Sequence, residues 1–227
     1  MAKRICFISK PNEKPIFKEM EIEFKYHTGF AISQKQKSIN AMHEEIKHLD
    51  SSLRVLEIST KSSNPIGVSL SAFNLKFLDE NSGKEYPLEN IFQSSKVFES
   101  GGPFRDLLNV SPKDAKRDER LKESGKLLYF SCDNINWELE PKTMFYDWIY
   151  IQSLYRNESL SKRILDYDAF TDIEFNHEKS INCQARSAAI FVSLSKIGKL
   201  EEVINKKEEF KKIYVKKPSD NLQTTLF

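Results

Sequence analysis

Apolar and small residues recur every three or four positions in residues 88–98, and this spacing predicts a helix with one stripe facing a core. The repeating positions are Leu88, Ile91, Phe92, Ser95 and Phe98. Gly101 follows the segment, and glycine is a common residue at the end of a helix. We therefore expect the chain to be organised around a helix that begins near Leu88.

Three polar residues lie beside that stripe. Glu89, Gln93 and Lys96 fall at i, i+4 and i+7, so a carboxylate, an amide and an ammonium leave one side of the helix together. They would suit a water-filled cleft. By spacing alone a solvated helix face is the commoner outcome, because charged residues usually lie on the surface.

The first sixty residues carry strand and helix patterns of their own. Residues 4–9 and 17–26 are rich in aromatic and β-branched residues, and the second run alternates apolar and charged positions as a half-buried strand does. Residues 33–50 repeat apolar positions at helical spacing, and residues 53–59 resemble another strand. This order predicts a small sheet with one helix across it.

Beyond the central helix, the sequence predicts a highly charged helix at residues 111–124. Ser111 is its expected N-cap and Gly125 its expected end. Arg117 and Arg120 would share a face of this helix at i and i+3, a spacing that can hold a diphosphate in a bidentate grip.

Two further segments complete the pattern. Residues 141–155 predict a core helix, because their apolar and aromatic residues leave little room for a polar face. Residues 168–176 are acidic and aromatic, and we interpret them as extended. An extended chain would place Asp172 and Glu174, two positions apart, on the same side.

Composition narrows the function classes. The 227 residues are 39% hydrophobic, which is enough to bury the core of one large domain. Lys plus Arg number 35 and Asp plus Glu number 33, and the net charge of +2 argues against a dedicated nucleic-acid coat or a membrane-surface protein.

The positions of the cysteines and histidines narrow the function classes further. The three cysteines form no CxxC pair and the four histidines show no zinc spacing, so we expect a reduced protein without metal or cofactor. His43 and His48 lie off the apolar stripe of their helix and are expected on the surface. The sequence shows neither a signal peptide nor a membrane span, which favours a cytoplasmic location.

Several segments, taken in order, resemble the NADAR superfamily, whose members include the YbiA-like proteins. They read LSAF, LENIFQSSKVF, SPKDAKRDERL, then Trp137, ESLSKRILDYDAFTDIEFN and KSINCQARSAA. The likeness covers roughly residues 67–194. The N-terminal extension, residues 1–63, and the sequence FTDIEFN look most like those of the NADAR antitoxins encoded beside DarT-type DNA ADP-ribosyltransferases.

The chain departs from the YbiA-type pattern at three places. Asn90 stands where a His follows the Glu, Ala72 stands where the first motif has Asn between Ser71 and Phe73, and the late Trp-Gly pair is missing. These departures bear on the YbiA-type substrate more than on the chemistry.

The resemblance implies an α+β fold, with a mainly helical NADAR-like domain and a small N-terminal β-sheet extension. We place the strand-rich extension at residues 1–63 and the catalytic domain at residues 64–198. A C-terminal helix and a tail that we expect to be mobile would occupy residues 199–227.

The resemblance also implies an N-glycosidase that removes ADP-ribose from guanine in DNA, acting as antitoxin to a paired toxin that adds it. Departure of a base from C1 of a ribose builds positive charge on the sugar, which a nearby carboxylate stabilises. Glu89 matches the family Glu and is the first candidate for this role. Asp172 or Glu174 is the candidate for a second acid that holds the ribose hydroxyls or shares the water.

The other candidates would bind the substrate. Phe92 or Trp137 is expected to stack on a base, and Lys96 and Arg120 to meet the phosphates. The full set of expected substrate-binding residues is Ser71, Phe73, Phe92, Gln93, Lys96, Arg120, Trp137 and Asn182.

Two alternative functions stay open from the sequence. One is an N-glycosidase that acts on a small phosphorylated metabolite, as in the YbiA-like branch. The other is a module that binds ADP-ribose without turning it over. ADP-ribosylated guanine DNA separates the three hypotheses, because only the first releases ADP-ribose from it.

The chain ends in QTTLF, residues 223–227. This ending resembles the short Gln-x-x-Leu-Phe peptides by which bacterial DNA-processing proteins dock on the sliding clamp. Two apolar residues at the end of a polar tail need a partner, which would be either the clamp or the chain's own domain. The clamp is therefore a further expected partner.

Overall fold

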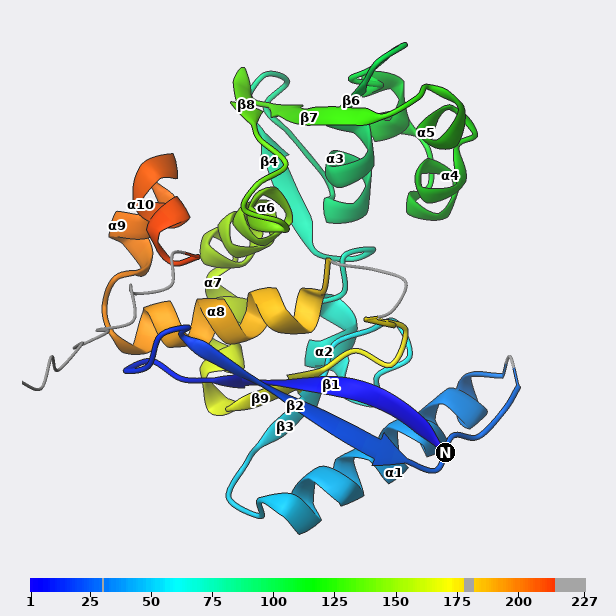
Figure 1. Ribbon diagram of the computed structural model, residues 1–227, viewed down its shortest axis with the longest axis vertical. Coiled ribbons are helices and arrows are strands. Elements are labelled where there is room, and N and C mark those ends of the chain that lie inside the picture. Colours follow the sequence, from blue (N-terminus) through cyan, green and yellow to red (C-terminus); the bar gives the residue numbers. More distant parts are fainter. Residues whose placement is uncertain (30, 178–181, 215–227) are drawn as a thin grey trace, which may run out of the picture.

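The computed structural model describes residues 1–29, 31–177 and 182–214, and its fold is α+β as expected. Figure 1 shows two regions stacked along the long axis, a lower one built on one sheet and an upper one that contains two small sheets. Helices α6 (Met144–Arg156) and α8 (Gln184–Lys196) lie between the two regions and pack against each other.

The lower region is a four-stranded sheet with the strand order β2-β1-β9-β3. Its strands are β1 (Ala2–Ser9), β2 (Phe17–Phe24), β3 (Val55–Glu57) and β9 (Ala169–Thr171). Strand β1 pairs antiparallel with β2 and β9, whereas β3 and β9 are parallel.

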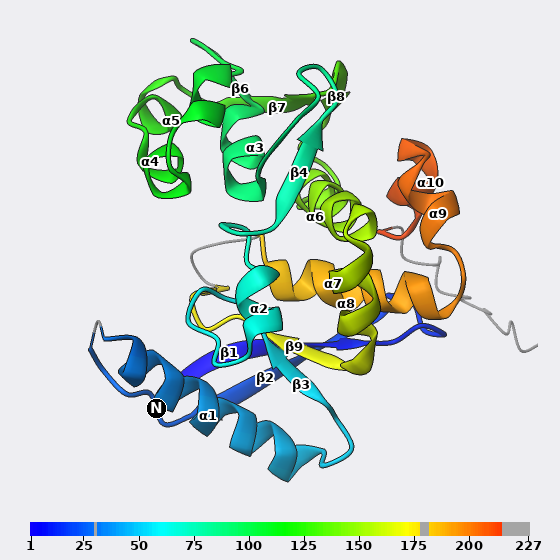
Figure 2. The same ribbon diagram turned by 180° about the vertical axis from the view of Figure 1, so that it is seen from behind.

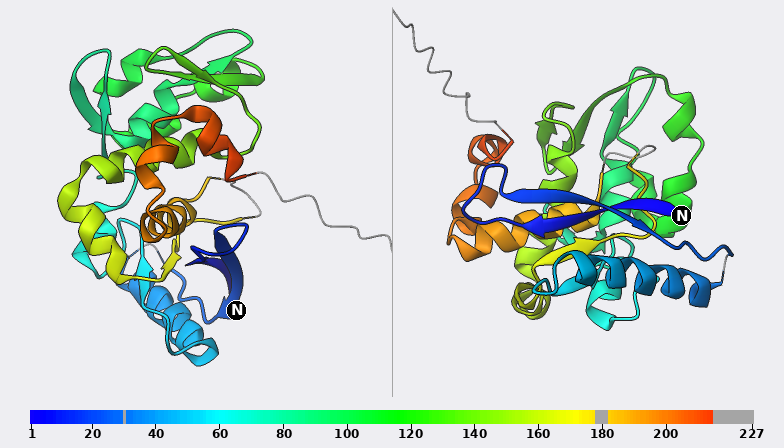
Figure 3. Two further views of the ribbon diagram at one scale, coloured as in Figure 1. Left: turned by 90° about the vertical axis from the view of Figure 1, so that its left-hand side faces the viewer. Right: turned by 60° about the horizontal axis from the view of Figure 1, so that its bottom comes forward.

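Both faces of this sheet are covered, as Figure 3 shows. Cys6 and Ile8 pack in one cluster with Ile39 and Met42 of α1 (Ile32–Leu49). Phe7, which points to the opposite face, belongs to the larger cluster that includes α8. The predicted small sheet with a helix across it is confirmed.

Strand β9 joins the two predicted segments. It comes from residues 64–198 and yet lies between β1 and β3, which both come from residues 1–63. The two segments therefore share one hydrogen-bonded sheet, and the division at residue 63 stays a prediction.

The upper region holds the central helix, α3 (Leu88–Ser94), and two small sheets (Figures 1 and 2). Their strands are β4 (Lys76–Asp79) with β5 (Lys84–Pro87), and β6 (Lys96–Phe98), β7 (Leu127–Cys132) and β8 (Ile135–Trp137). Helix α2 (Pro65–Ser69) precedes β4 in the chain.

The predicted helix over residues 88–98 is wrong after Ser94. Lys96, Val97 and Phe98 form β6 and pair antiparallel with β7. Gly101 does not end a helix but bridges back to Phe98. β-branched and aromatic side chains favour a strand when a neighbouring strand supplies the hydrogen bonds, and that partner lies about thirty residues further along the chain.

The charged helix predicted at residues 111–124 is two helices, α4 (Pro112–Arg117) and α5 (Arg120–Glu123). The Ser111 hydroxyl caps α4 by accepting a hydrogen bond from the Asp114 amide at 3.2 Å. Asp118 takes an extended conformation between the two helices, so Arg117 and Arg120 do not share one helix face, and that prediction is wrong.

Of the remaining helical elements, α7 (Glu158–Arg163), α9 (Leu200–Ile204) and α10 (Lys207–Lys212) contact α6, whereas η1 (Arg105–Asn109) packs against α3 and η2 (Ile164–Asp166) against α7 and α8. Helix α6 is buried along most of its length, which confirms the predicted core helix. Its fully buried Asp147 pairs with Arg186 and accepts hydrogen bonds from Ser187 at 2.5 Å and Tyr214 at 2.6 Å, so it ties α6 to α8 and to the segment after α10.

Among the residues that the structure describes, no helix has the length and apolar character needed to span a bilayer. The QTTLF ending, residues 223–227, lies outside the described residues, and its role as a clamp motif stays a prediction.

Candidate functional site

Glu89, Gln93 and Lys96 form one hydrogen-bonded chain. The Gln93 amide donates to the Glu89 carboxylate at 2.8 Å, and the Lys96 ammonium donates to the Gln93 amide oxygen at 2.7 Å. Glu89 and Gln93 are only 6% and 5% exposed, so they are not a solvated helix face. Although Lys96 belongs to β6 rather than to the helix, the three predicted polar groups do lie together.

Lys96 has an unusual environment for an ammonium group. Its Nζ lies over the Phe92 ring, 4.8 Å from the ring centroid. The pKa of Lys96 is lowered to about 8: burial is the main cause, the Glu89 carboxylate opposes it, and the charge of Lys116 adds to it. The side chain is therefore a cation at neutral pH that loses its proton in mildly alkaline solution.

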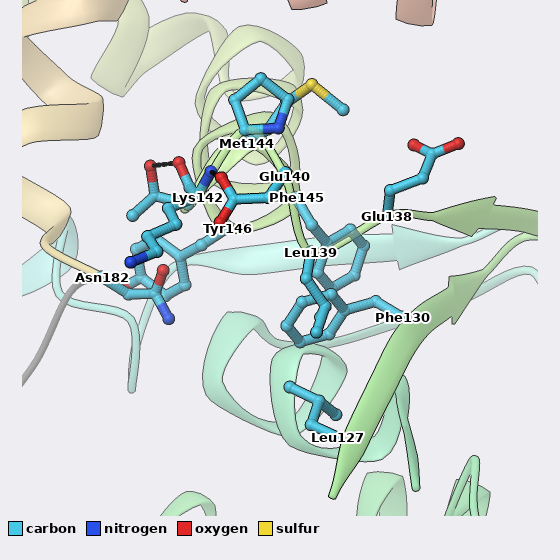
Figure 4. A pocket seen from close by; sticks show the side chains of 12 residues that line it. Leu127, Phe130, Glu138, Leu139, Glu140, Lys142, Met144, Phe145, Tyr146 and Asn182 are labelled. Atoms are coloured by element: carbon cyan, nitrogen blue, oxygen red, sulfur yellow. Dashed lines mark hydrogen bonds between the residues drawn. The ribbon is translucent and has the colours of Figure 1, made fainter.

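Phe92 connects this polar chain to a pocket. Its ring lies 5.4 Å from the Phe130 ring and meets the Tyr146 ring edge to face at 5.2 Å. The pocket has a volume of about 280 Å³. Figure 4 shows Phe130 and Phe145 gathered on one side of it, with Asn182 and Tyr146 on the other. Flat aromatic walls of this kind suit a planar base.

The predicted extended segment ends at Thr171, and a turn follows it. The Asp172 carbonyl accepts from the Phe175 amide at 3.1 Å, and the Asp172 carboxylate accepts from the Glu174 amide at 3.0 Å. Asp172 and Glu174 therefore do not lie on one side of a strand, and that prediction is wrong. The short polar side chain of Asp172 caps its own turn, which sequence alternation does not reveal.

The turn separates the environments of the two acids. Asp172 is only 8% exposed, and its carboxylate accepts from the Gln184 amide at 3.0 Å. Burial, and after it the charge of Glu57, raises the pKa of Asp172 to about 8. The side chain of Glu174 is 48% exposed and pairs with Lys35 at 3.3 Å.

Tyr146 lines the pocket and lies near both Glu89 and Asp172. Burial raises the pKa of the Tyr146 hydroxyl, and the Glu89 and Asp172 charges raise it further. Both carboxyl groups are thus close enough to act electrostatically on a side chain that lines the pocket. Glu89, Tyr146 and Asp172 come from three elements and form what we call the acidic site.

A series of hydrogen bonds links the backbone at Glu89 to the side chain of Asp172. The Glu89 amide donates to the Ala72 carbonyl at 2.9 Å, and the Ala72 amide donates to the Gln184 side chain at 2.8 Å. Gln184 then donates to Asp172 and to the Ile58 carbonyl. Gln184 on α8 thereby links the turn that carries Asp172 to the loop at Ala72, which in turn is hydrogen-bonded to the first turn of α3.

The structure places three other predicted residues, Ser71, Phe73 and Asn182, near these elements. Ser71 is buried beside Ala72, and its hydroxyl has no hydrogen-bond partner among the described residues. Phe73 is partly buried under the Lys116 ammonium, which lies 5.7 Å from its ring centroid. Asn182 lines the pocket, and Asn90, which occupies the His position of the YbiA pattern, donates to the Leu107 and Val110 carbonyls instead.

Two predicted substrate-binding residues lie apart from the acidic site. Arg120 is paired with Asp106 and Asp118, at 2.6 and 2.9 Å, and it lies over the Phe104 ring. Trp137 is completely buried, 4.7 Å from the Trp148 ring. Arg120 would have to leave two carboxylates to meet a phosphate, and Trp137 would have to leave the core to meet a base.

Sequence reasoning missed Glu57, Gln184 and Tyr146. Glu57 is a charge at the end of a short apolar strand, which is a signal that a buried polar role leaves in sequence, whereas Tyr146 is one of several tyrosines in its helix and carries no such signal. The surface position expected for His43 is wrong. His43 is partly buried beneath the sheet, with its Nε2 2.9 Å from the Thr171 hydroxyl, and burial lowers its pKa to about 4.

A protein-family model matches this chain. The family model described as "DarT1-associated NADAR antitoxin" matches residues 2–224, nearly the whole chain. A search of curated proteins found no match. The matched range includes the N-terminal strands as well as the acidic site.

Proposed function

The chain belongs to the family of DarT1-associated NADAR antitoxins, and from this premise we propose that it hydrolyses the N-glycosidic bond between ADP-ribose and guanine in DNA. Its partner in the cell is then the toxin that makes this modification. The observation that carries the proposal is the acidic site: two buried carboxyl groups, Glu89 and Asp172, come from different elements that hydrogen bonds through Ala72 and Gln184 join, and both lie near Tyr146, which lines an aromatic-walled pocket.

Glu89 has the role of the carboxylate. As the bond between ribose C1 and the base nitrogen breaks, the bonding electron pair leaves with the base and the ribose becomes positively charged. A fixed carboxylate beside the ring stabilises that charge and takes a proton from the attacking water. Gln93 orients the Glu89 carboxylate for this purpose, and the burial of both groups strengthens the electrostatic effect.

Asp172 has the role of the acid. A carboxyl group with a pKa of about 8 is protonated at neutral pH, so it can give its proton to the departing base nitrogen. Glu174 is exposed and ion-paired, so Asp172 is the better candidate of the two acids. Water supplies the hydroxyl that remains on C1, and free ADP-ribose is the product.

The rest of the site binds the substrate. A pocket of about 280 Å³ with Phe130, Phe145 and Tyr146 in its walls can hold one planar base, with the Asn182 amide at its rim. Lys96 is the cation nearest to Glu89 along the hydrogen-bonded chain, and we assign it to the phosphates of ADP-ribose.

The role of Lys96 makes binding depend on pH. Its charged form is present below a pKa of about 8 and is lost above it, so the dissociation constant of ADP-ribose should rise about tenfold between pH 7 and pH 9. The Lys96→Arg variant keeps its charge and should bind equally well over that range. Calorimetric titration of both proteins with ADP-ribose measures this, and a wild-type constant that does not change with pH would remove Lys96 from the phosphate site.

The function itself is tested by incubating the protein with DNA that carries ADP-ribosylated guanine. Release of free ADP-ribose and recovery of unmodified guanine would support the proposal. Binding without release would indicate an ADP-ribose binding module. A protein that neither binds this DNA nor releases ADP-ribose from it would instead favour an N-glycosidase that acts on a small phosphorylated metabolite.

A further inference from the structure

Glu57 is a buried carboxyl group that the reaction as described does not use. It ends strand β3, pairs in parallel register with Thr171 of β9, and is 2% exposed. Its two oxygens accept from the Thr171 hydroxyl at 2.6 Å and from the Ile173 amide at 2.9 Å. Asp172 is the residue between these two donors, so Glu57 accepts hydrogen bonds from the neighbours of Asp172 on both sides in the sequence.

A hydrogen-bonded chain continues from Glu57 towards α1. Thr171 has one hydroxyl hydrogen, which it donates to Glu57, so the Nε2 of His43 must be the donor in its 2.9 Å contact with the same hydroxyl. Burial keeps His43 neutral above a pKa of about 4, which is consistent with one N–H donor at that nitrogen. The chain runs His43 to Thr171 to Glu57.

Several titratable groups surround the two carboxyl groups. They are Glu174 in the turn with its partner Lys35 on α1, His43 and Lys47 on α1, Tyr146 and Tyr150 on α6, and Cys183 at the start of α8. Among the neighbours named here, Lys35 is already paired with the exposed Glu174, and the tyrosines and the thiol are neutral at pH 7 because burial raises their pKa values.

Hydrogen bonding decides which of the two acids carries the charge. Glu57 accepts from the Thr171 hydroxyl at 2.6 Å and from the Ile173 amide at 2.9 Å, whereas Asp172 accepts from the Gln184 and Glu174 amides at 3.0 Å each. Donors stabilise the ionised form, and two buried carboxyl groups that repel each other do not both ionise readily. Burial raises the pKa of both groups, but the shorter hydrogen bonds to Glu57 favour its ionised form, so Glu57 ionises first and Asp172 keeps its proton.

We infer that Glu57 is a positioning residue for the proposed reaction: its carboxylate, held by Thr171 and Ile173 on either side of Asp172, keeps Asp172 protonated for transfer to the departing base. The inference rests on the proposed function. It also gives the N-terminal segment a catalytic purpose, since β3 carries Glu57 and α1 carries His43, which completes its hydrogen bonding.

The test is the Glu57→Gln variant of the full chain, which keeps the size and planarity of the side chain but removes its charge. The carbon-13 chemical shift of the Asp172 carboxyl group, followed by NMR between pH 5 and pH 10, gives its titration midpoint without any need for activity. We expect the midpoint to fall by about one pH unit or more. The high-pH decline of kcat on ADP-ribosylated DNA should move down by a similar amount, with KM nearly unchanged.

Two further variants keep the test decisive. Glu19→Gln removes an exposed charge from β2 of the same sheet and should leave the midpoint where it is. Thr171→Val removes one donor from Glu57 and should give a smaller shift in the same direction, and it replaces the first variant if Glu57→Gln does not fold.

The outcomes separate the inference from the proposed function. An Asp172 midpoint that stays the same in both Glu57→Gln and Thr171→Val would overturn the role of Glu57, even in a chain that releases ADP-ribose. A shifted midpoint in a chain that releases no ADP-ribose from DNA would overturn the proposed function and leave the electrostatic coupling standing.

Discussion

Replacing Glu89 with Gln should slow the release of ADP-ribose from modified DNA by about a hundredfold or more, while the fold and the affinity for ADP-ribose stay close to those of the wild type. The amide has the shape of the carboxylate, and its oxygen can still accept from Gln93. What it lacks is the negative charge, which matters only when the ribose becomes positive. The loss should therefore fall on kcat and not on binding.

Single-turnover hydrolysis and calorimetric binding, measured side by side, check this prediction. Glu85→Gln is the matched control, because Glu85 is exposed on β5, three positions before the start of α3. A Glu89→Gln enzyme that hydrolyses at the wild-type rate would end the assignment of Glu89 as the charge-stabilising group.

Asp172→Asn and Glu174→Gln should differ sharply. The kcat of the Asp172→Asn variant should fall about a hundredfold, because the asparagine side chain has no acidic proton to give to the departing base. Glu174→Gln should lose less than about threefold, because it breaks only an exposed ion pair with Lys35, and such pairs contribute little. Rates with ADP-ribosylated DNA at pH 7 measure the difference.

Thermal melting must accompany these rates. The Asp172→Asn side chain would turn an amide towards the Gln184 amide, which is already committed to Ala72 and Ile58. A small loss of stability is therefore expected, and rates should be compared well below the melting temperature. If both variants keep nearly full activity, the turn from Asp172 to Phe175 has only a structural role.

Some of the molecule follows from local pattern. The spacing of residues 88–98 predicts a helix that the structure forms as far as Ser94, and the apolar and aromatic residues of 141–155 predict the core helix α6. The positions of Glu89 and Gln93 on one side of α3 follow from helix geometry alone. The ordered motifs identify the family, and the match over residues 2–224 confirms it. In each case the information lies within one element or in the order of elements.

Other features depend on partners far away in the chain. Strand β6 forms where a helix was predicted, because β7 offers it a ladder of hydrogen bonds. His43 is partly buried, contrary to its position off the apolar stripe, because Thr171 of β9 comes to lie beside it. Local spacing cannot foresee either outcome, since both depend on an element more than thirty residues away.

The same reason explains the choice between the two acids. In sequence, Asp172 and Glu174 are equivalent candidates two positions apart. In the structure, Gln184 and Glu57 act on Asp172 from other elements, while Glu174 faces solvent and Lys35. A sequence determines which groups can ionise and how a local element orients them. Burial and neighbouring charge determine which group holds a proton at neutral pH, and both arise only when distant elements pack together.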